Sequence, residues 1–390
     1  MKKTSLRVML ALVATLLLLV PSSVLAFQVG DLSIGGAIRA NYTIGDYAPR
    51  SGEGPSRADE DGGDFDLDVF RINLDYERGN WVAKAEYRFY PGYNMLHTGW
   101  FGYNFDDGSQ VQVGVNRVPF GPGAYGVSQS WMFDQHYYVG LSDDMDLGVK
   151  YSKNIDNLAL DFAYYAMSEG DWYGGSEDSA RYSYDVVDAS GDGYEEEHQF
   201  NVRAIYTISS GDITTDLGAS LQYGLLDSNG PQDDGDHFAG SVHATTSIGN
   251  LTIAPQLTYY SYDVDEDQPL GTDKKVQFGA YDYNTAVAAE AFIPAISVSY
   301  KIETPQLDWL SYVLPYVEYS SIMKDESDFN DSDMFVVGAA WANGGWYIYT
   351  DLAYSNGNDF VGNESGWDRY AANPDDEWEY RGNINFGYYF

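Results

Sequence analysis

Charged side chains recur at every second position in stretches that are otherwise apolar. Around Trp81, for example, Ala83 and Ala85 alternate with Lys84 and Glu86. Ionised groups in such numbers require water around them, because an ionised group in a dry interior costs several kcal/mol. Eight basic and eight acidic residues occupy the polar positions of this two-residue alternation. We predict that they line a hydrated interior wall: Arg39, Arg71, Asp75, Lys84, Glu86, Arg88, Asp146, Lys150, Asp161, Arg203, Asp216, Lys301, Glu318, Asp351, Glu379 and Arg381.

Residues that commonly carry catalysis or hold cofactors are scarce. The chain has no Cys, which excludes disulfides, thiolate metal sites and a Cys nucleophile, and it has five His. His97 has the parity of the apolar face and no nucleophile beside it, whereas His243 has the inward parity of a hydrated wall. We therefore expect no enzyme, no cofactor and no resident metal, apart from divalent cations bound loosely at acidic outer loops.

The alternation predicts the elements that must position these charges. About ten residues suffice for a tilted strand to cross a membrane, and short connections alternate with long ones, as in outer-membrane barrels. We therefore predict an all-β fold, a transmembrane antiparallel β-barrel of about 16 strands with short periplasmic turns and long acidic outer loops. The sixteen segments are 31–45, 66–78, 80–90, 95–105, 110–118, 145–152, 157–167, 198–208, 213–225, 237–248, 250–262, 294–303, 309–321, 333–342, 345–355 and 378–390.

The strand count has one alternative. Residues 276–283 could form a further strand, which by itself would give an odd number. Single-chain bacterial barrels have even numbers of strands. We therefore place residues 276–291 in the sixth long loop and keep eighteen strands as the alternative.

The two ends of the chain indicate its compartment. Residues 1–26 combine early basic residues, a short apolar run and a cleavage-like triplet, which predicts a secretory signal peptide. A retained membrane helix is the alternative, which the short apolar run disfavours. Residues 27–390 then form a single barrel domain. Phe386, Tyr388 and Phe390 end the chain in a pattern that resembles the C-terminal signal read by the barrel assembly machinery, so we expect the outer membrane of a Gram-negative bacterium.

Net charge and aromatic residues indicate the partners. The formal net charge is −38, and the seven long loops hold 40 acidic and 7 basic residues. Such a surface excludes nucleic acid as a partner and would enrich cations at the outer mouth, although solubility alone could explain it. Divalent cations could bridge these loops to lipopolysaccharide. Aromatic residues near both ends of many segments predict two girdles in a lipid bilayer.

The connection 118–144 is too apolar for a solvated outer loop. Its aromatic and Gly-rich run contains Trp131, Phe133, Asp134 and His136. We predict that it folds inward and forms a constriction, with Trp131 and Phe133 against the inner wall and Asp134 near the narrowest point.

Two stretches resemble the phosphate-selective porin O/P family. Residues 113–121 read VGVNRVPFG, similar to the segment that leads into that family's constriction loop, and residues 70–74 (FRINL) with 79–81 (GNW) resemble its second and third strands. The resemblance covers about residues 30–150. It implies a sixteen-stranded, homotrimeric, passive pore. The family's basic constriction loop is absent, because Arg117 is the basic residue at the edge of a loop that contains Asp134.

These observations together predict an outer-membrane porin. Ions and small hydrophilic solutes would diffuse through it, with a modest preference for cations because acidic residues dominate the mouth. Two alternatives stay open. One is a structural or binding barrel, such as an adhesin or a sleeve around a periplasmic partner, and the other is an anion- or phosphate-type porin.

Overall fold

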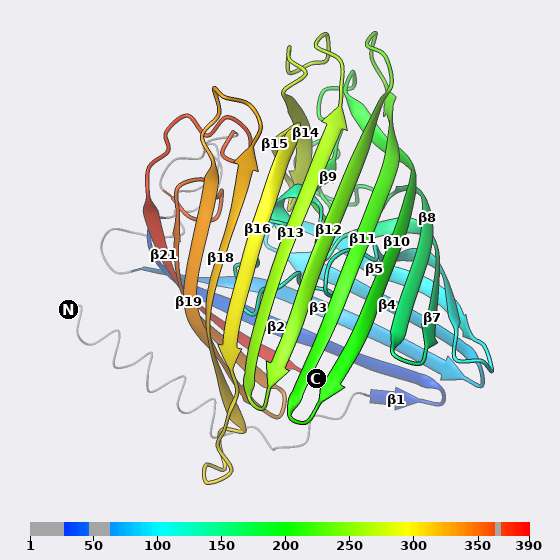
Figure 1. Cartoon of the computed structure of the whole chain (residues 1–390), viewed down its shortest axis with the longest axis vertical. Coiled ribbons are helices and arrows are strands. Elements are labelled where there is room, and N and C mark those ends of the chain that lie inside the picture. Colours follow the sequence, from blue (N-terminus) through cyan, green and yellow to red (C-terminus); the bar gives the residue numbers. More distant parts are fainter. Residues whose placement is uncertain (1–26, 47–62, 363–367) are drawn as a thin grey trace.

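The computed structural model describes residues 27–46, 63–362 and 368–390, so the predicted signal peptide 1–26 lies outside the described residues. Over this part of the chain the fold is a closed barrel of sixteen antiparallel strands (Figure 1), which confirms the predicted fold class and strand number. β2 pairs with both β3 and β21, which closes the sheet. Among the described residues no helix is long and apolar enough to span a bilayer.

The barrel strands follow one another in chain order. They are β2 (Leu32–Gly45), β3 (Asp64–Arg78), β4 (Trp81–Tyr90), β5 (Tyr93–Asn104), β6 (Gln110–Arg117), β7 (Met145–Ile155), β8 (Leu158–Ser168), β10 (Tyr194–Ser210), β11 (Ile213–Ser228), β12 (Gly235–Ile248), β13 (Leu251–Asp263), β16 (Glu290–Tyr300), β18 (Tyr312–Lys324), β19 (Ser332–Asn343), β20 (Trp346–Ser355) and β21 (Glu379–Tyr389). Two short strands extend this sheet, namely β1 (Phe27–Val29) beside β2 and β17 (Ile302–Glu303) beside β18.

Side chains alternate across the wall as the sequence pattern predicts. In β11, Leu217, Leu221 and Tyr223 are exposed on the outside, whereas Ser220 and Gln222 are buried on the inside. Large apolar side chains that face outward are stable in lipid, and polar side chains that face inward need water or hydrogen-bond partners. This arrangement is that of a membrane barrel.

The alternation is interrupted in β5. Glu86 pairs with Thr98 and Tyr87 pairs with Leu96, so His97 is an extra residue that forms a β-bulge. His97 is buried inside the barrel, beside Glu86. The prediction that His97 faces outward is therefore wrong, because one extra residue moves the following side chains to the opposite face.

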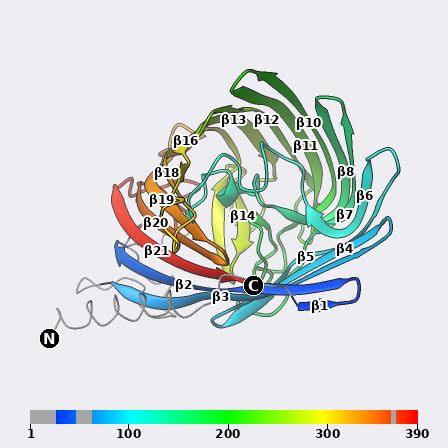
Figure 2. The same ribbon diagram turned by 90° about the horizontal axis from the view of Figure 1, so that it is seen from below.

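Three long connections, which we call loop 118–144, loop 169–193 and loop 264–289, fold into the barrel. Loop 118–144 contains one 3-10 turn, η1 (Tyr137–Val139). The other two contribute β9 (Asp185–Val186), β14 (Lys275–Ala280) and β15 (Tyr283–Ala288) to a small antiparallel sheet, the inner sheet. Figure 2 shows β14 within the ring of barrel strands. Most of the region predicted as the sixth long loop is therefore ordered as the β14–β15 hairpin.

A packed aromatic core lies between these loops. Tyr137 and Tyr138 of loop 118–144 lie 5.5 Å, between ring centroids, from Tyr184 of loop 169–193. Tyr281 of loop 264–289 lies 5.7 Å from Tyr182 and hydrogen-bonds to Tyr137. Aromatic pairs of this kind stabilise by about 0.5–1.5 kcal/mol beyond the area that they bury. Ring packing therefore orders the interior at the loop end of the barrel.

Candidate functional site

Loop 118–144 is hydrogen-bonded to the inner wall through its backbone. Trp131 N donates to Asp351 Oδ2 at 3.0 Å, and Gln129 N donates to a carboxylate oxygen of Glu318. Asp351 and Glu318 are 6% and 4% exposed. Both acids were predicted to line a pore, and both face inward. In the structure, however, they hold the loop against β18 and β20.

Further contacts show how far the loop reaches. Gly121 N donates to Ser220 Oγ of β11 at 3.1 Å, and Gln135 N donates to Ser320 Oγ of β18 at 3.0 Å. His136 Nε2 lies 2.8 Å from Thr258 Oγ1 of β13. A loop that starts at β6 therefore crosses the interior and is fastened to several strands of the wall.

Asp134 organises the loop from within. Its Oδ2 accepts a hydrogen bond from Val127 N at 3.0 Å, and its Oδ1 accepts one from His136 N and lies 2.9 Å from His136 Nδ1. The side chain is 2% exposed. Gly126 has φ +60°, and a Cβ there would lie 2.6 Å from Asp134 Oδ2. Asp134 thus satisfies backbone N–H groups inside the loop and does not face a passage, contrary to the predicted role.

The two aromatic residues predicted at the constriction differ in their contacts. The guanidinium of Arg381 lies 4.9 Å from the ring centroid of Trp131, which places Trp131 against the wall at β21. Phe133 stacks on Tyr137 of its own loop, with centroids 4.1 Å apart, and lies 5.9 Å from Tyr125. Trp131 therefore contacts the wall, and Phe133 supports the loop.

An ion pair joins the two ends of loop 118–144 next to β6 and β7, which we call the neck of the loop. Arg117 Nη2 lies 2.7 Å from Asp143 Oδ1, and Tyr182 donates to Asp143 Oδ2 at 2.6 Å. Burial opposes ionisation of Asp143, but Arg117 and His97 hold the pKa of its carboxyl well below its usual value. The carboxylate stays charged and joins loops 118–144 and 169–193.

Most of the charges predicted to line a pore form ion pairs along the inner wall. The pairs are Arg39–Asp68 (2.9 Å), Arg71–Glu86 (3.3 Å), Arg88–Glu86 (2.6 Å), Lys84–Asp75 (3.0 Å), Arg203–Asp161 (2.8 Å) and Lys301–Glu303 (2.6 Å). Glu379 pairs with Arg369 at 3.0 Å. The remaining charges bond to polar groups: Asp146 accepts from Gln199, Lys150 donates to Arg117 O, Asp216 accepts from Thr207, and Arg381 donates to Phe360 O. The wall therefore carries charges of both signs in mutual contact.

One partner in these pairs escaped the sequence analysis. Asp68 is skipped in the pairing of β2 with β3, where Arg39 pairs with Val69 and Ala40 pairs with Leu67. This bulge changes the parity of β3, so a strict alternation assigns Asp68 to the outer face. The sequence does contain a signal of this bulge. The apolar residues stand at odd positions from Phe65 and at even positions from Phe70, so the alternation shifts by one residue between them.

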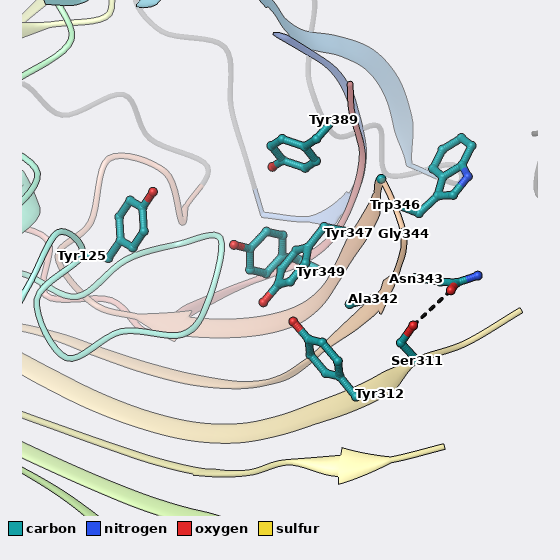
Figure 3. Close-up of a pocket in the computed structure, with 11 residues that line it drawn as sticks. Tyr125, Ser311, Tyr312, Ala342, Asn343, Gly344, Trp346, Tyr347, Tyr349 and Tyr389 are labelled. Carbon is teal, nitrogen blue, oxygen red and sulfur yellow. Dashed lines mark hydrogen bonds between the residues drawn. The ribbon is translucent and has the colours of Figure 1, made fainter. Parts of the chain in front are cut away.

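A cavity of about 480 Å³ lies between the tip of loop 118–144 and the short-turn ends of β18 to β21. Figure 3 shows Tyr125 of the loop opposite Tyr347, Tyr349 and Tyr389 of the wall. Tyr125 is 53% exposed. The full lining is Tyr125, Ser311, Tyr312, Ala342, Asn343, Gly344, Gly345, Trp346, Tyr347, Tyr349 and Tyr389. We call this the tyrosine cavity. The sequence analysis missed it, because no spacing distinguishes these residues among 35 Tyr.

Two arginines adjoin the tyrosine cavity. The guanidinium of Arg71 lies 5.1 Å from the ring centroid of Tyr389, and that of Arg117 lies 5.9 Å from the centroid of Tyr125. Each also contacts a carboxylate, Glu86 for Arg71 and Asp143 for Arg117. Hydroxyl groups and compensated charges therefore surround this space, which suits water and small hydrophilic solutes.

Comparison with known proteins supports the fold. No family model matches the chain, and no curated protein matches it in sequence. Among solved structures, the outer membrane channel DcaP of Acinetobacter baumannii has a TM-score of 0.58 at 10% identity, over 94% of this chain and all of that one. The trimer form of OmpT from Vibrio cholerae has a TM-score of 0.55 at 15% identity (92% and 99% covered), and an anion-selective porin from Comamonas acidovorans has 0.56 at 12% (92% and 99%).

These likenesses agree with the fold that the resemblance implies, the barrel of the outer-membrane porins. At such low identity they concern the fold alone. Membership of the phosphate-selective porin O/P family stays a prediction.

Proposed function

We propose that this chain is an outer-membrane porin of a Gram-negative bacterium, through which ions and small hydrophilic solutes diffuse passively. Loop 118–144 is the observation that carries the proposal. It is fastened across the interior of a sixteen-stranded barrel by Ser220, Thr258, Glu318 and Asp351. A barrel of this size has room for an aqueous channel, and an inward loop narrows it. A sleeve around a periplasmic partner needs a free lumen, so the loop favours a porin over that alternative.

The proposed passage includes the tyrosine cavity. Tyr125 stands at the tip of the loop, and the opposite tyrosines belong to the wall. Their hydroxyl groups can exchange hydrogen bonds with water or a solute, and the loop contacts keep Tyr125 in place. We therefore infer that solute size is limited between Tyr125 and β18–β21.

A modest cation preference is the selectivity that we propose, with the acidic loops as its source. Arg39, Arg71 and Arg88 each contact a carboxylate, so this row of the described wall does not form a free basic ladder for an anion. Acidic loops act on ions within about a Debye length, roughly 8 Å at physiological salt. This pairing counts against an anion- or phosphate-type porin.

The proposed assembly is a homotrimer in the outer membrane. The exposed apolar outer wall suits a lipid bilayer, and one structurally similar protein, OmpT of Vibrio cholerae, is described in a trimer form. We further propose that the barrel assembly machinery reads Phe386, Tyr388 and Phe390, and that divalent cations link the outer loops to lipopolysaccharide. The backbone of Phe390 hydrogen-bonds with that of Gly36 at 2.8 and 3.0 Å, at the seam that closes the barrel.

Planar-bilayer recording of the folded full-length chain tests the proposal. We expect stepwise insertions with a defined conductance and a reversal potential of cationic sign in a potassium chloride gradient. A heat-unfolded sample is the matched control and should give no steps. Absence of conductance from the folded barrel would contradict the porin and favour the binding barrel, and an anionic sign would contradict the selectivity alone.

A further inference from the structure

Five carboxylates meet inside the barrel, outside the proposed passage. They are Asp144 at the end of loop 118–144, Asp146 at the start of β7, Glu169 and Asp185 of loop 169–193, and Glu196 of β10. All five are at most 8% exposed. Asp144, Asp146 and Asp185 each offer one ligand atom, and these atoms lie within 4.8 Å of one another.

The charge of this cluster is not balanced by basic residues. In the described part of the chain, Arg181 is the cation in contact with it, 3.3 Å from Asp185 Oδ2, and Arg181 also pairs with Asp178. Buried charges without partners cost several kcal/mol each, so protons or a bound cation must neutralise them. Burial and the neighbouring carboxylates raise the pKa values of Asp144 and Asp185 well above their usual range, which shows the same imbalance.

Several oxygens of the cluster lack a hydrogen-bond donor. Asp144 Oδ1, Asp146 Oδ1 and Glu169 Oε2 are buried without one. The other oxygen of Glu169 accepts hydrogen bonds from the backbone of loop 169–193 at 2.8 and 3.2 Å, and the carboxylate of Glu169 interacts electrostatically with those of Asp144 and Asp185. The free oxygen of Glu169 therefore belongs to the same cluster.

An amide oxygen adjoins these carboxylates. Gln199 Nε2 donates to Asp146 Oδ2 at 2.8 Å, and Gln199 Oε1 is buried without a donor. Buried acceptors normally have a partner, and in the described part of the chain no group donates to Asp144 Oδ1, Asp146 Oδ1, Glu169 Oε2 or Gln199 Oε1. A bound cation is a ligand that all of these oxygens can share, and it would also neutralise the carboxylates.

The ligand atoms identify the class of cation. They are carboxylate and amide oxygens without Cys or His, which suits a hard cation. Ca²⁺ binds six to eight oxygens at about 2.3–2.6 Å in flexible geometry, whereas Mg²⁺ demands a near-ideal octahedron at about 2.0–2.1 Å. Two oxygens that bind the same Ca²⁺ are at most about 4.6–5.2 Å apart, so three aspartate oxygens that lie within 4.8 Å of one another can share one ion.

We propose that Asp144, Asp146 and Asp185 bind one Ca²⁺ inside the barrel, with Glu169 and Gln199 as further ligands. The ion would join the inner sheet, through Asp185 of β9, to the neck of loop 118–144. That neck is closed by a hydrogen bond from Val118 N to Asp144 O at 2.9 Å. The site does not depend on conductance, because it would hold loops together in any barrel of this fold.

Calorimetric titration of the folded full-length protein with CaCl₂, after EDTA treatment and removal of the chelator, tests the site. We expect saturable binding of one Ca²⁺ per chain, lost in the double variant D144N/D185N. E169Q should weaken binding by about 10- to 100-fold, because the affinity of a site for Ca²⁺ depends on the number of its charged ligands. The matched control is E195Q/E197Q, which removes two exposed charges on either side of Glu196 and should bind as the wild type does.

Two results would overturn the proposal. One is the absence of saturable binding to the wild-type protein, which would mean that protons neutralise the cluster. The other is an equal loss in E195Q/E197Q, which would mean diffuse attraction by surface charge.

A second measurement covers the case in which D144N/D185N does not fold. Tb³⁺ bound to the wild-type protein should emit on tyrosine excitation, because Tyr165 and Tyr262 interact electrostatically with the cluster. Stoichiometric displacement of Tb³⁺ by Ca²⁺, with Mg²⁺ much weaker, would support the site. No tyrosine-sensitised emission, or equal displacement by Mg²⁺, would contradict the assignment of Ca²⁺.

Discussion

The two ends of the barrel interior solve the problem of charge in different ways. Toward the short turns, Lys84 and Asp75 form an ion pair while remaining 56% and 44% exposed. Toward the loops, Tyr137 and Tyr182 are buried, and Asp144 lies among other carboxylates. Of the described basic residues, Arg181 contacts this cluster, through Asp185. Water can stabilise charges at the first end, whereas at the second the protein or a bound ion must do so. The comparison indicates that charges at the short-turn end are hydrated, whereas aromatic rings and inward loops fill the loop end.

The largest expected effect concerns closure of the barrel sheet at its short-turn end. Replacing Phe390 by Asp should strongly reduce the amount of assembled barrel, because Phe390 lies at the seam with Gly36 and presents an apolar ring to lipid. A charge near the interface costs only up to about 1 kcal/mol, so poor recognition during assembly should dominate. Heat-modifiable folded protein in outer-membrane fractions is the measurement. Phe390→Tyr should assemble normally, and normal assembly of the Asp variant would refute the signal.

Removing residues 123–135 should raise single-channel conductance several-fold and admit larger solutes. This segment contains Tyr125 at the tyrosine cavity and the backbone groups held by Glu318 and Asp351. Planar-bilayer conductance and liposome swelling with sugars of increasing size measure the effect. Removing residues 229–234, in the β11–β12 connection, is the control and should leave conductance unchanged. If both deletions behave alike, the loop does not narrow the passage.

The next prediction tests the fastening of the loop. Glu318→Leu removes the acceptor of Ser128 Oγ and Gln129 N, and an unsatisfied buried group costs about 1–3 kcal/mol. We expect a lower unfolding temperature and rapid current fluctuations as the loop moves. Asp216→Leu is the matched control, because Asp216 bonds to Thr207 within the wall. Steady single-channel currents in the Glu318→Leu variant would mean that the remaining hydrogen bonds are enough to hold the loop in place.

The sequence predicted the wall well because a strand repeats every two residues, and a membrane barrel enforces that period on both faces. The prediction was wrong where a β-bulge shifts the two-residue alternation by one position. The bulges at Asp68 and His97 each insert one residue, so parity assigned these two inward side chains to the wrong face. A bulge depends on pairing with a neighbouring strand, which a single segment of sequence does not contain.

The loops were predicted less well for a different reason. Acidic composition suggested that residues 168–197 and 263–290 lie in solvent, yet both form strands of the inner sheet. Tyr184 and Tyr281 pack their rings against loop 118–144 and against each other, and Phe278 packs on Tyr262 of β13. The role of Asp134 was misjudged in the same way. The charge of Asp134 suggested that its carboxylate interacts with passing ions. In the structure the carboxylate instead accepts hydrogen bonds from backbone N–H groups of its own loop.

A matched pair of wall variants compares a shielded with a hydrated ion pair. Glu86→Gln removes the carboxylate that contacts both Arg71 and Arg88, at a cost of up to about 3–5 kcal/mol, and should shift the reversal potential toward anions. Asp75→Asn leaves only an exposed Lys84, so its effect on stability should stay below about 1 kcal/mol. Chemical unfolding and reversal potentials measure both. Equal effects would show that water reaches both pairs alike.

The smallest effect concerns the outer mouth. Because the wall charges are paired and Asp134 is buried, the cation preference should come from the acidic loops. Screening shortens the Debye length from about 30 Å at 0.01 M salt to about 3 Å at 1 M, so the preference should fade as salt rises. Neutralising Glu195 and Glu197 should lower it in dilute potassium chloride and change nothing in concentrated potassium chloride. Asp134→Asn should leave it unchanged at both, provided that the loop stays folded. A preference that persists at 1 M would place an unpaired charge inside the passage. The inner wall, and not only the acidic loops, would then select for cations.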